Sequence, residues 1–215
     1  MKIIRIAASD KLYSSNAFLI LGDWKRIEDV NTLIDTGSDP DIVDKIMDIN
    51  TGLGKRKIDH VIITHDHSDH TASLPLIKKA FKPRVFAFSP YMDGVDWVLK
   101  GGDRLRVGDR MCDILHFPGH SDDSVIIHNA QDGDLFAGDA PLILSSSTGS
   151  YDRRFRENLA LLSTRNIKAI YFGHGEPLLT GAKQAICASV QTLGSGRDPT
   201  DTKAQKRAVE EAMNY

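Results

Sequence analysis

Four side chains able to bind a metal ion stand within six residues of one another, directly after an apolar run. They are His65, His67, Asp69 and His70, and the run before them covers residues 61–63. A strand that ends in a loop would turn such side chains into one cleft. Imidazole nitrogens and carboxylate oxygens are donors that zinc, iron and manganese accept, at about 2.0–2.2 Å for zinc. The spacing therefore predicts a transition-metal site rather than a solvated polar loop.

Three further residues with side chains that can bind a metal, His120, Asp139 and His174, follow later in the chain. Each comes directly after a glycine and close behind an apolar, β-rich run. A single Gly-His or Gly-Asp at a strand end is typical of an ordinary turn or cap. Taken singly, none of the three therefore predicts a ligand.

The H-x-H-x-D-H cluster at a strand end resembles the metallo-β-lactamase superfamily. The superfamily has three more ligands, each at the end of a later strand, and His120, Asp139 and His174 stand at such positions. The resemblance spans residues 34–176, about two thirds of the chain. It implies an α+β fold, namely a four-layer αββα sandwich of two similar halves. It also implies two metal ions, one held by His65, His67 and His120 and the other by Asp69, His70 and His174, with Asp139 bridging both.

Asp35 lies in the sequence Leu-Ile-Asp-Thr-Gly at residues 33–37, which is similar to a superfamily motif whose aspartate orients a metal ligand. We expect its carboxylate to accept an imidazole N–H and fix the tautomer of a ligand. The same pattern is also the signature of aspartic proteases, in which two such carboxylates share a proton. One copy is present here, and a protease would leave the metal-ligand pattern unexplained.

The resemblance implies hydrolysis by a metal-bridging hydroxide. Two divalent ions about 3.5–4 Å apart lower the pKa of a shared water from 15.7 toward about 7 and polarise the carbonyl or phosphoryl oxygen of the substrate. Zinc is the expected metal, with iron or manganese as alternatives. Asp69 is predicted to act in catalysis as well, by accepting a hydrogen bond from the attacking water.

Departures from the subfamily patterns narrow the activity. Asp139 argues against a β-lactamase, since those enzymes generally lack the bridging aspartate, and His67 argues against a flavodiiron protein, which has glutamate there. Glyoxalase II-type relatives carry a helical domain after the last histidine, whereas 41 residues follow His174. Lactonase relatives often carry a tyrosine shortly after the bridging aspartate, and this chain has none there. Ala72 stands where many relatives have glycine, a change too mild to indicate a subfamily.

The prediction is therefore a binuclear hydrolase of a small ester-like molecule: a thioester, a carboxylic ester or lactone, or a phosphodiester. Thioesters and carboxylic esters are preferred. The alternative is an oxidoreductase similar to mononuclear-iron persulfide dioxygenases, and a non-catalytic binding module is a third possibility that the complete ligand set disfavours. The sequence predicts neither the identity of the substrate nor the oligomeric state.

Two segments beside the predicted site are candidates for substrate contacts. Residues 145–156 include Tyr151, Arg153 and Arg154, which could meet an anionic substrate or simply lie on the surface. Residues 92–98 include Trp97, for which core packing is preferred over a role as an apolar wall of the site.

The elements that must position these residues are short strands and amphipathic helices. Asp39 and Pro40 predict a helix start, with the acid as cap, and Gly52 its end. Apolar stripes predict three more helices, near residues 74–81, 155–162 and 186–193. Strands are predicted at residues 3–7, 17–21, 32–34, 60–64, 84–88, 111–117, 124–128, 135–137 and 168–172. The remaining histidines, His60, His116 and His128, are interpreted as structural or surface residues.

Length and composition favour one globular domain over residues 1–215. Its halves are expected over about 1–100 and 101–196, with a weakly docked helix over 197–215. A net charge of −2 disfavours nucleic acid and anionic membranes as partners, which leaves a small-molecule substrate. No apolar run is long enough to span a bilayer, and Cys112 and Cys187 lack paired spacing, so we expect free thiols and a cytoplasmic location.

Overall fold

Strands from the first part of the chain form one mixed sheet. The computed structural model describes residues 1–7, 12–145 and 151–195. The sheet has the order β1-β2-β3-β4-β5-β6, antiparallel from β1 to β3 and parallel from β3 to β6. Its strands are β1 (Lys2–Ile6), β2 (Ala17–Leu21), β3 (Thr32–Ile34), β4 (His60–Ile62), β5 (Arg84–Ala87) and β6 (Trp97–Val98).

Strands from the second part form another sheet, with the order β11-β10-β9-β8-β7. It is antiparallel from β7 to β10, and β10 pairs parallel with β11. Its strands are β7 (Arg104–Val107), β8 (Arg110–His116), β9 (Val125–Asn129), β10 (Asp134–Gly138) and β11 (Ala169–Phe172).

The two sheets pack face to face because their strands alternate large apolar side chains between two buried faces. Phe18 of β2 and Phe136 of β10 meet between the sheets, with ring centroids 5.7 Å apart. Their neighbours in the strands, such as Leu19 and Leu135, point instead to the outer faces, where separate apolar clusters form. Each sheet is therefore covered on both sides.

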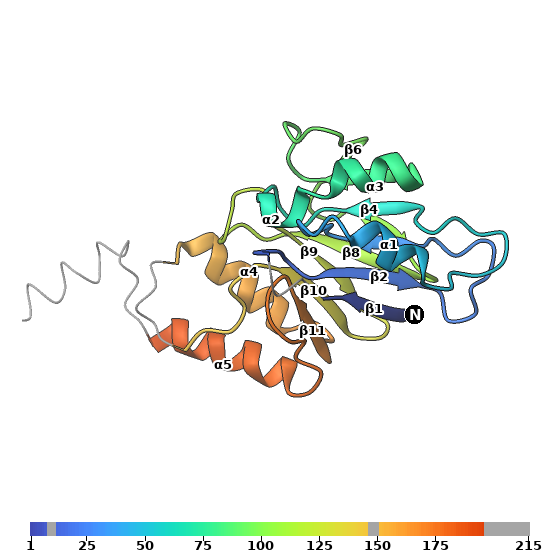
Figure 1. Ribbon diagram of the computed structural model, residues 1–215. Helices are drawn as coiled ribbons and strands as arrows, with labels where there is room; N and C mark the ends of the chain where they lie inside the picture. The colour runs from blue at the N-terminus through green and yellow to red at the C-terminus, as the bar shows by residue number, and fades with distance from the viewer. Residues whose placement is uncertain (8–11, 146–150, 196–215) are drawn as a thin grey trace, which may run out of the picture.

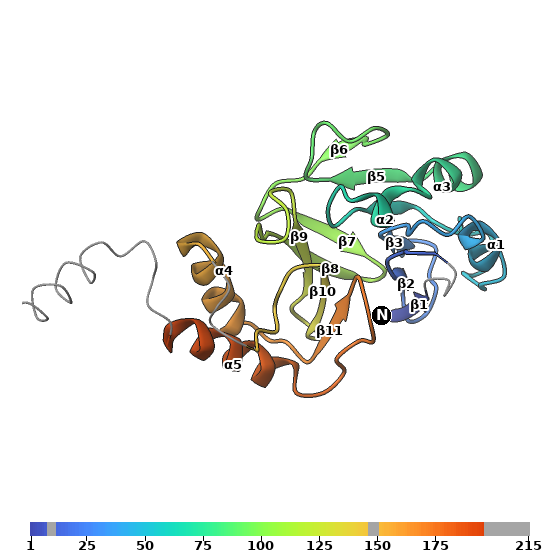
Figure 2. The same cartoon turned by 60° about the vertical axis from the view of Figure 1, so that its left-hand side comes forward.

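Helices supply the two outer layers. The first sheet is covered by α1 (Ile42–Met47) and α3 (Leu74–Phe81), and the second by α4 (Arg153–Ser163) and α5 (Ala182–Ser195). Figures 1 and 2 show these helix pairs on opposite sides of the two sheets. The short helix α2 (Ser68–Thr71) lies instead at one end of the strands. The predicted α+β sandwich with αββα layers is confirmed.

Several predicted details differ from the structure. Helix α1 begins at Ile42, with Asp41 as its N-cap, because the carboxylate of Asp39 accepts from the Asp41 N–H at 3.0 Å and forms a turn instead. The helix ends at Met47 and not near Gly52, which lies outside the helix with φ 107°. Strands β6 and β7 were not predicted. Trp97 of β6 is 60% exposed, so the preferred core position for this residue is wrong.

Two expectations remain predictions. One is the assignment of a single domain to residues 1–215, and the other is the helix over 197–215, which lies outside the described residues. Among the helices of the described part, none has the length and apolarity needed to cross a membrane.

Candidate metal centre

The seven predicted ligands come together at one end of the sandwich. Parallel strands that end at the same edge bring their following loops together, and the loop after β4 leads through His65 and His67 into α2, which carries Asp69 and His70. The other three ligands follow β8, β10 and β11. They form two sets whose possible donor atoms lie within 4.8 Å of one another: the first ligand group, His65, His67 and His120, and the second ligand group, Asp69, His70, Asp139 and His174.

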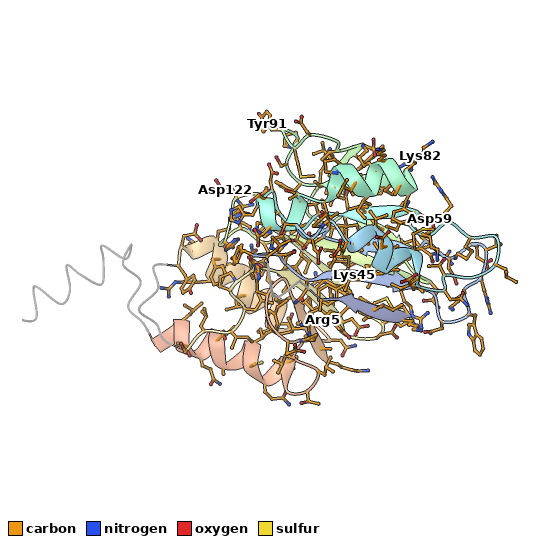
Figure 3. The ribbon with its side chains drawn as sticks, in the orientation of Figure 1. Arg5, Lys45, Asp59, Lys82, Tyr91 and Asp122 are labelled. Atoms are coloured by element: carbon orange, nitrogen blue, oxygen red, sulfur yellow. The ribbon has the colours of Figure 1, made fainter. Side chains whose placement is uncertain are left out.

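Each ligand group draws residues from both sheets. The residues at 65–70 follow the first sheet, whereas His120, Asp139 and His174 follow strands of the second. Figure 3 labels Asp122, two residues after His120, at the same end of the molecule as α2. The labelled Asp59 and Lys82 lie at the opposite end.

Asp139 lies between the two groups. Its Oδ2 is 3.6 Å from Nε2 of His120 and 3.5 Å from Nε2 of His174, and its Oδ1 is 3.3 Å from Nε2 of His70. The strand before it is irregular: the pairing of β10 with β11 shifts register between Phe136 and Gly138. Such a bulge redirects the chain and aims the side chain that follows. The position suits a residue shared by two ions, and that role stays a prediction.

The first ligand group consists of closely packed imidazoles. Nε2 of His120 lies 3.0 Å from Nδ1 of His67, and the ring of His65 lies 4.5 Å and 4.8 Å from the rings of His67 and His120. Burial disfavours the imidazolium, so it lowers the pKa of His65 to about 4 and also lowers the pKa of His120. Neutral imidazole is the form that binds a metal.

The second ligand group combines imidazoles with carboxylates. Nε2 of His174 lies 2.9 Å from Oδ2 of Asp69. Burial opposes the charged form of His70, but the carboxylates of Asp35 and Asp139 outweigh it and raise the pKa of His70 to about 10. In the metal-free protein this imidazole therefore carries a proton at neutral pH, and a metal ion must displace that proton.

Asp35 fixes the ring of His70 from behind. One carboxylate oxygen accepts from Nδ1 of His70 and from Oγ1 of Thr64, and the other accepts from the Thr64 N–H, all at 2.8 Å. Nδ1 is thereby occupied, and Nε2 faces the second ligand group. Asp35 itself has φ 56°, a left-handed conformation that Asp tolerates better than most residues. Its effect on metal affinity stays a prediction.

Small residues let the ligands approach one another. A Cβ at Gly173 would lie 2.3 Å from Oδ1 of Asp139 and 2.6 Å from Cε1 of His70. A Cβ at Gly138, where φ is 52°, would lie 2.6 Å from Oγ1 of Thr64. The glycines that precede His174 and Asp139 are therefore required by space and, at Gly138, by conformation.

Unsatisfied buried atoms show that the cluster fits a cation. Among the described residues, Nε2 of His65 is buried without a hydrogen bond, and Nε2 of His70 and Oδ1 of Asp139 are buried 3.3 Å apart with no other hydrogen-bond partner. An unsatisfied buried polar group costs about 1–3 kcal/mol, and a cation in each ligand group would remove that cost. The donors are nitrogens and carboxylate oxygens, which suits a divalent transition metal. The residues present therefore fit the divalent metal ions that this fold implies.

The predicted substrate-contact residues are dispersed. Tyr151 lines a pocket of about 240 Å³ beside His120 and stacks on Phe155 with ring centroids 4.7 Å apart. Arg154 donates to Nδ1 of His116 at 2.9 Å, and Arg153 pairs with a glutamate one helical turn later.

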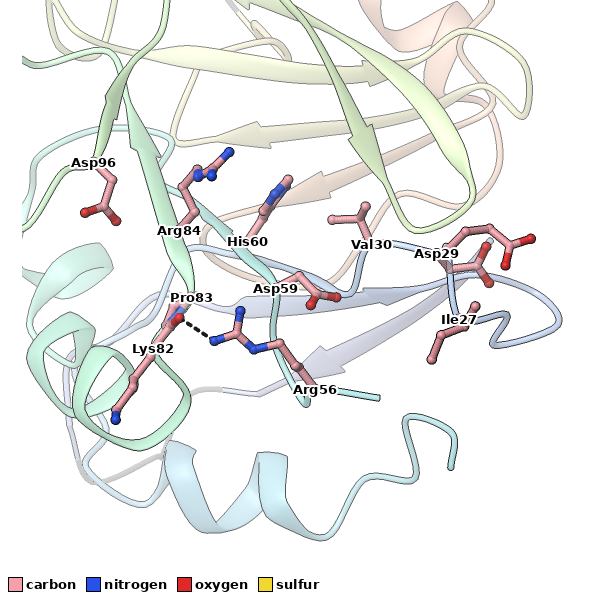
Figure 4. A pocket seen from close by; sticks show the side chains of 11 residues that line it. Ile27, Asp29, Val30, Arg56, Asp59, His60, Lys82, Pro83, Arg84 and Asp96 are labelled. Carbon is pink, nitrogen blue, oxygen red and sulfur yellow. Dashed lines mark hydrogen bonds between the residues drawn. The ribbon is translucent and has the colours of Figure 1, made fainter. Parts of the chain in front are cut away.

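The three histidines without a predicted ligand role lie outside both ligand groups. His116 stacks on Phe88 at 3.9 Å, and the ring of His128 is bonded to the Asn166 carbonyl at 2.8 Å. His60 lies in a pocket of about 640 Å³ at the opposite end, where the parallel strands begin (Figure 4). That pocket mixes both signs of charge, and the guanidinium of Arg56 is already bonded to the Lys82 carbonyl at 2.8 Å.

Comparison with known proteins identifies the family. Residues 10–174 match the metallo-beta-lactamase superfamily, which is most of the chain. The chain belongs to the metallo-beta-lactamase superfamily.

Its curated relatives include named hydrolases. The chain is 28% identical over 160 residues to a hydroxyacylglutathione hydrolase of Rhizobium meliloti (strain 1021), covering 72% of this chain and 59% of the relative. It is 26% identical over 184 residues to an atrochrysone carboxyl ACP thioesterase of Aspergillus novofumigatus, covering 81% of this chain and 54% of the relative. The chain thus spans less than two thirds of the length of these relatives.

Solved structures share the fold. ETHE1 from Myxococcus xanthus has a TM-score of 0.63 at 20% identity, with 92% of this chain and 93% of that chain covered. The BLEG-1 B3 metallo-beta-lactamase has a TM-score of 0.61 at 20% identity, with 85% of this chain and 96% of that chain covered. At this identity the likeness concerns the fold alone.

Proposed function

We propose that this chain is a metal-dependent hydrolase of a small ester-like substrate. The observation that carries the proposal is the pair of ligand groups at one end of the sandwich, with Asp139 of the second group 3.6 Å from His120 of the first. His65, His67 and His120 would hold one divalent ion and Asp69, His70 and His174 a second, with Asp139 reaching both. Zinc is our preferred metal, with iron and manganese as alternatives that accept the same nitrogen and oxygen donors.

Bound divalent ions would supply a water of lowered pKa and polarise the oxygen of the scissile group. The chain's own residues prepare the site for that chemistry. The Asp35 carboxylate keeps the proton of His70 on Nδ1, so that Nε2 is free to act as a ligand. Oδ2 of Asp69 lies 2.9 Å from Nε2 of His174, and there it would accept a hydrogen bond from the attacking water and orient it.

A thioester is the substrate class that the relatives favour. Two of them are named a hydroxyacylglutathione hydrolase and an acyl carrier thioesterase, and both names describe removal of an acyl group from a thiol carrier. The proposal therefore ranks thioesters above carboxylic esters, lactones and phosphodiesters. A cytoplasmic location and a small-molecule substrate belong to the same proposal.

The test combines metal content with a substrate panel. Protein purified without chelator should contain close to two transition-metal ions per chain and should hydrolyse at least one thioester, ester, lactone or phosphodiester. Chelation should abolish turnover, and zinc should restore it without oxygen or a reductant, since zinc has no redox chemistry. Fully active protein that contains no transition metal would overturn the proposal.

The alternative, an oxidoreductase similar to persulfide dioxygenases, gives a different result in the same experiment. It requires one iron per chain and consumption of oxygen with a persulfide. If zinc-loaded protein is inert on the whole panel while iron-loaded protein consumes oxygen, the hydrolase proposal fails and the alternative replaces it.

A further inference from the structure

Segment 13–16, which leads into β2, contacts the second ligand group through its backbone. The Ser15 N–H donates to the carbonyl of Asp69 at 3.0 Å, and the Asn16 N–H donates to the carbonyl of Gly173 at 2.7 Å. One short segment therefore joins the helix that carries Asp69 to the turn that carries His174. Nothing in the local sequence pattern had singled out this segment.

The side chain of Asn16 holds the His174 turn on both sides of the histidine. Its Nδ2 donates to the carbonyl of Phe172 at 3.1 Å and to the carbonyl of Gly175 at 2.9 Å. An asparagine amide has two N–H donors, and here both are used. With the backbone bond to Gly173, three carbonyls around His174 are bonded to one residue, which is 3% exposed.

A charged neighbour fixes the orientation of this amide. Oδ1 of Asn16 accepts from Nε of Arg5 at 3.0 Å, and the same guanidinium pairs with Glu176. Because the oxygen faces the guanidinium, the amide nitrogen must face the two carbonyls. The exposed ring of Tyr13 contacts His174 itself. It stacks on the imidazole, with centroids 5.3 Å apart and planes 20° apart.

The contacts of segment 13–16 are selective. In the described part of the chain its hydrogen bonds to other segments reach Arg5, Asp69, the 172–175 turn and Ser38, and none of those bonds reaches a histidine of the first ligand group. A change at Asn16 should therefore act on one group of ligands and leave the other in place.

We infer that Asn16 is a positioning residue that sets the affinity of the second ligand group for its ion. It acts through the His174 turn and does not itself reach the ion. The inference rests on the proposed metal centre. Partners that orient a metal ligand typically change metal affinity by about 10–100-fold when removed, and that is the effect expected here.

Asn16→Asp is the sharpest variant. The carboxylate keeps the shape of the side chain and the acceptor for Arg5, but it replaces both donors with an oxygen that faces two carbonyl oxygens. Asn31→Asp is the matched control: Asn31 is fully buried, its amide donates to the Arg56 carbonyl at 2.8 Å, and it lies at the opposite end of the strands.

The experiment titrates metal-free wild type, Asn16→Asp and Asn31→Asp with Zn²⁺ by calorimetry, and with Co²⁺ by its visible absorption. Wild type should take up two ions. Asn16→Asp should bind the first ion as wild type does and the second about 10–100-fold more weakly, with the Co²⁺ spectrum altered for the second ion alone. Asn31→Asp should leave both affinities unchanged.

Two results would overturn the inference: unchanged affinities in Asn16→Asp, or both affinities lowered by the same factor. If Asn16→Asp does not fold, Tyr13→Leu replaces it, because Tyr13 is 80% exposed and its change spares the core. Tyr13→Leu should weaken the binding of the second ion only. If both of its metal affinities equal those of the wild type, the role of segment 13–16 is rejected. A wild-type chain that binds no ion contradicts the proposed function instead, and is recognised without any variant.

Discussion

Asp35→Asn replaces one oxygen of a buried carboxylate by an amide nitrogen at a point where three donors converge. The donors are the N–H and Oγ1 of Thr64 and Nδ1 of His70, each 2.8 Å away. If the amide oxygen keeps the Thr64 N–H, the amide nitrogen faces His70. Nδ1 must then become the acceptor, and the imidazole proton moves to Nε2, where it occupies the lone pair needed for a metal.

The magnitude follows from that conflict. A hydrogen bond to a charged group contributes about 1.5–3 kcal/mol, and about 1.4 kcal/mol corresponds to a factor of ten in affinity. Loss of the hydrogen bond from His70 should therefore lower the affinity of the second ligand group for its ion by about 10–100-fold, the range typical of groups that orient metal ligands. The opposite amide orientation sets two donors against each other at Thr64 and does not avoid the cost.

The assay is competition for zinc against a chromophoric chelator, with circular dichroism to check folding. Asp29→Asn is the matched control, since Asp29 is 4% exposed and accepts from the Arg26 N–H at 2.7 Å far from the ligand groups. Folded Asp35→Asn protein with wild-type zinc affinity would refute the reasoning. The same would hold if Asp29→Asn weakened zinc binding by an equal factor.

Three other variants test separate parts of the structure. Asp139→Ala should deplete metal and activity far more than His60→Gln, measured by elemental analysis and turnover, and equal effects would count against a shared ligand. Gly173→Ala should keep its circular dichroism spectrum but lose metal, because the new Cβ would lie 2.3 Å from an oxygen of Asp139; normal metal content would contradict the close packing. Burial lowers the pKa of His128, with Arg165 acting in the same direction and the Asn166 carbonyl opposing. The folded state therefore favours the neutral ring, and this preference adds to the free energy of unfolding above the unfolded pKa near 6.5. The contribution is lost as the pH falls below that value, by at most about 1.4 kcal/mol per pH unit. Urea unfolding of metal-free protein at pH 7.5 and 5.5 should show a smaller loss for His128→Asn, and an unchanged loss would exclude His128 as a contributor.

The candidate ligands could be found in the sequence because their signal is local. His65, His67, Asp69 and His70 lie within one loop and one turn of helix, so spacing alone reveals them. The later ligands gain significance from their order and from the strands before them. The layers of the fold could be predicted for a similar reason, since alternating apolar residues in strands such as β2 mark two buried faces.

The parts that were missed depend on contacts between distant residues. Asn16 bonds to carbonyls 156 and 159 residues away, and no pattern around it points to them. Strand β6 has two residues, and β7 carries Arg104 and Arg106 at alternate positions on the edge of its sheet. Charged, short edge strands resemble surface turns in sequence. Asp39 looked like a helix cap because turn and cap residues share the same chemistry.

The division of each ligand group between the two sheets has a consequence for how the protein is made and how long it lasts. An ion held by either group cross-links residues 65–70 to residues that follow much later in the chain. Donors from both sheets meet only when the sheets have packed against each other, so we expect metal capture late in folding. Ligand binding to the native state alone adds about 4 kcal/mol of stability at a thousandfold excess over Kd. In a cell short of the metal, we therefore expect unfolding and proteolysis of the protein to add to the loss of turnover.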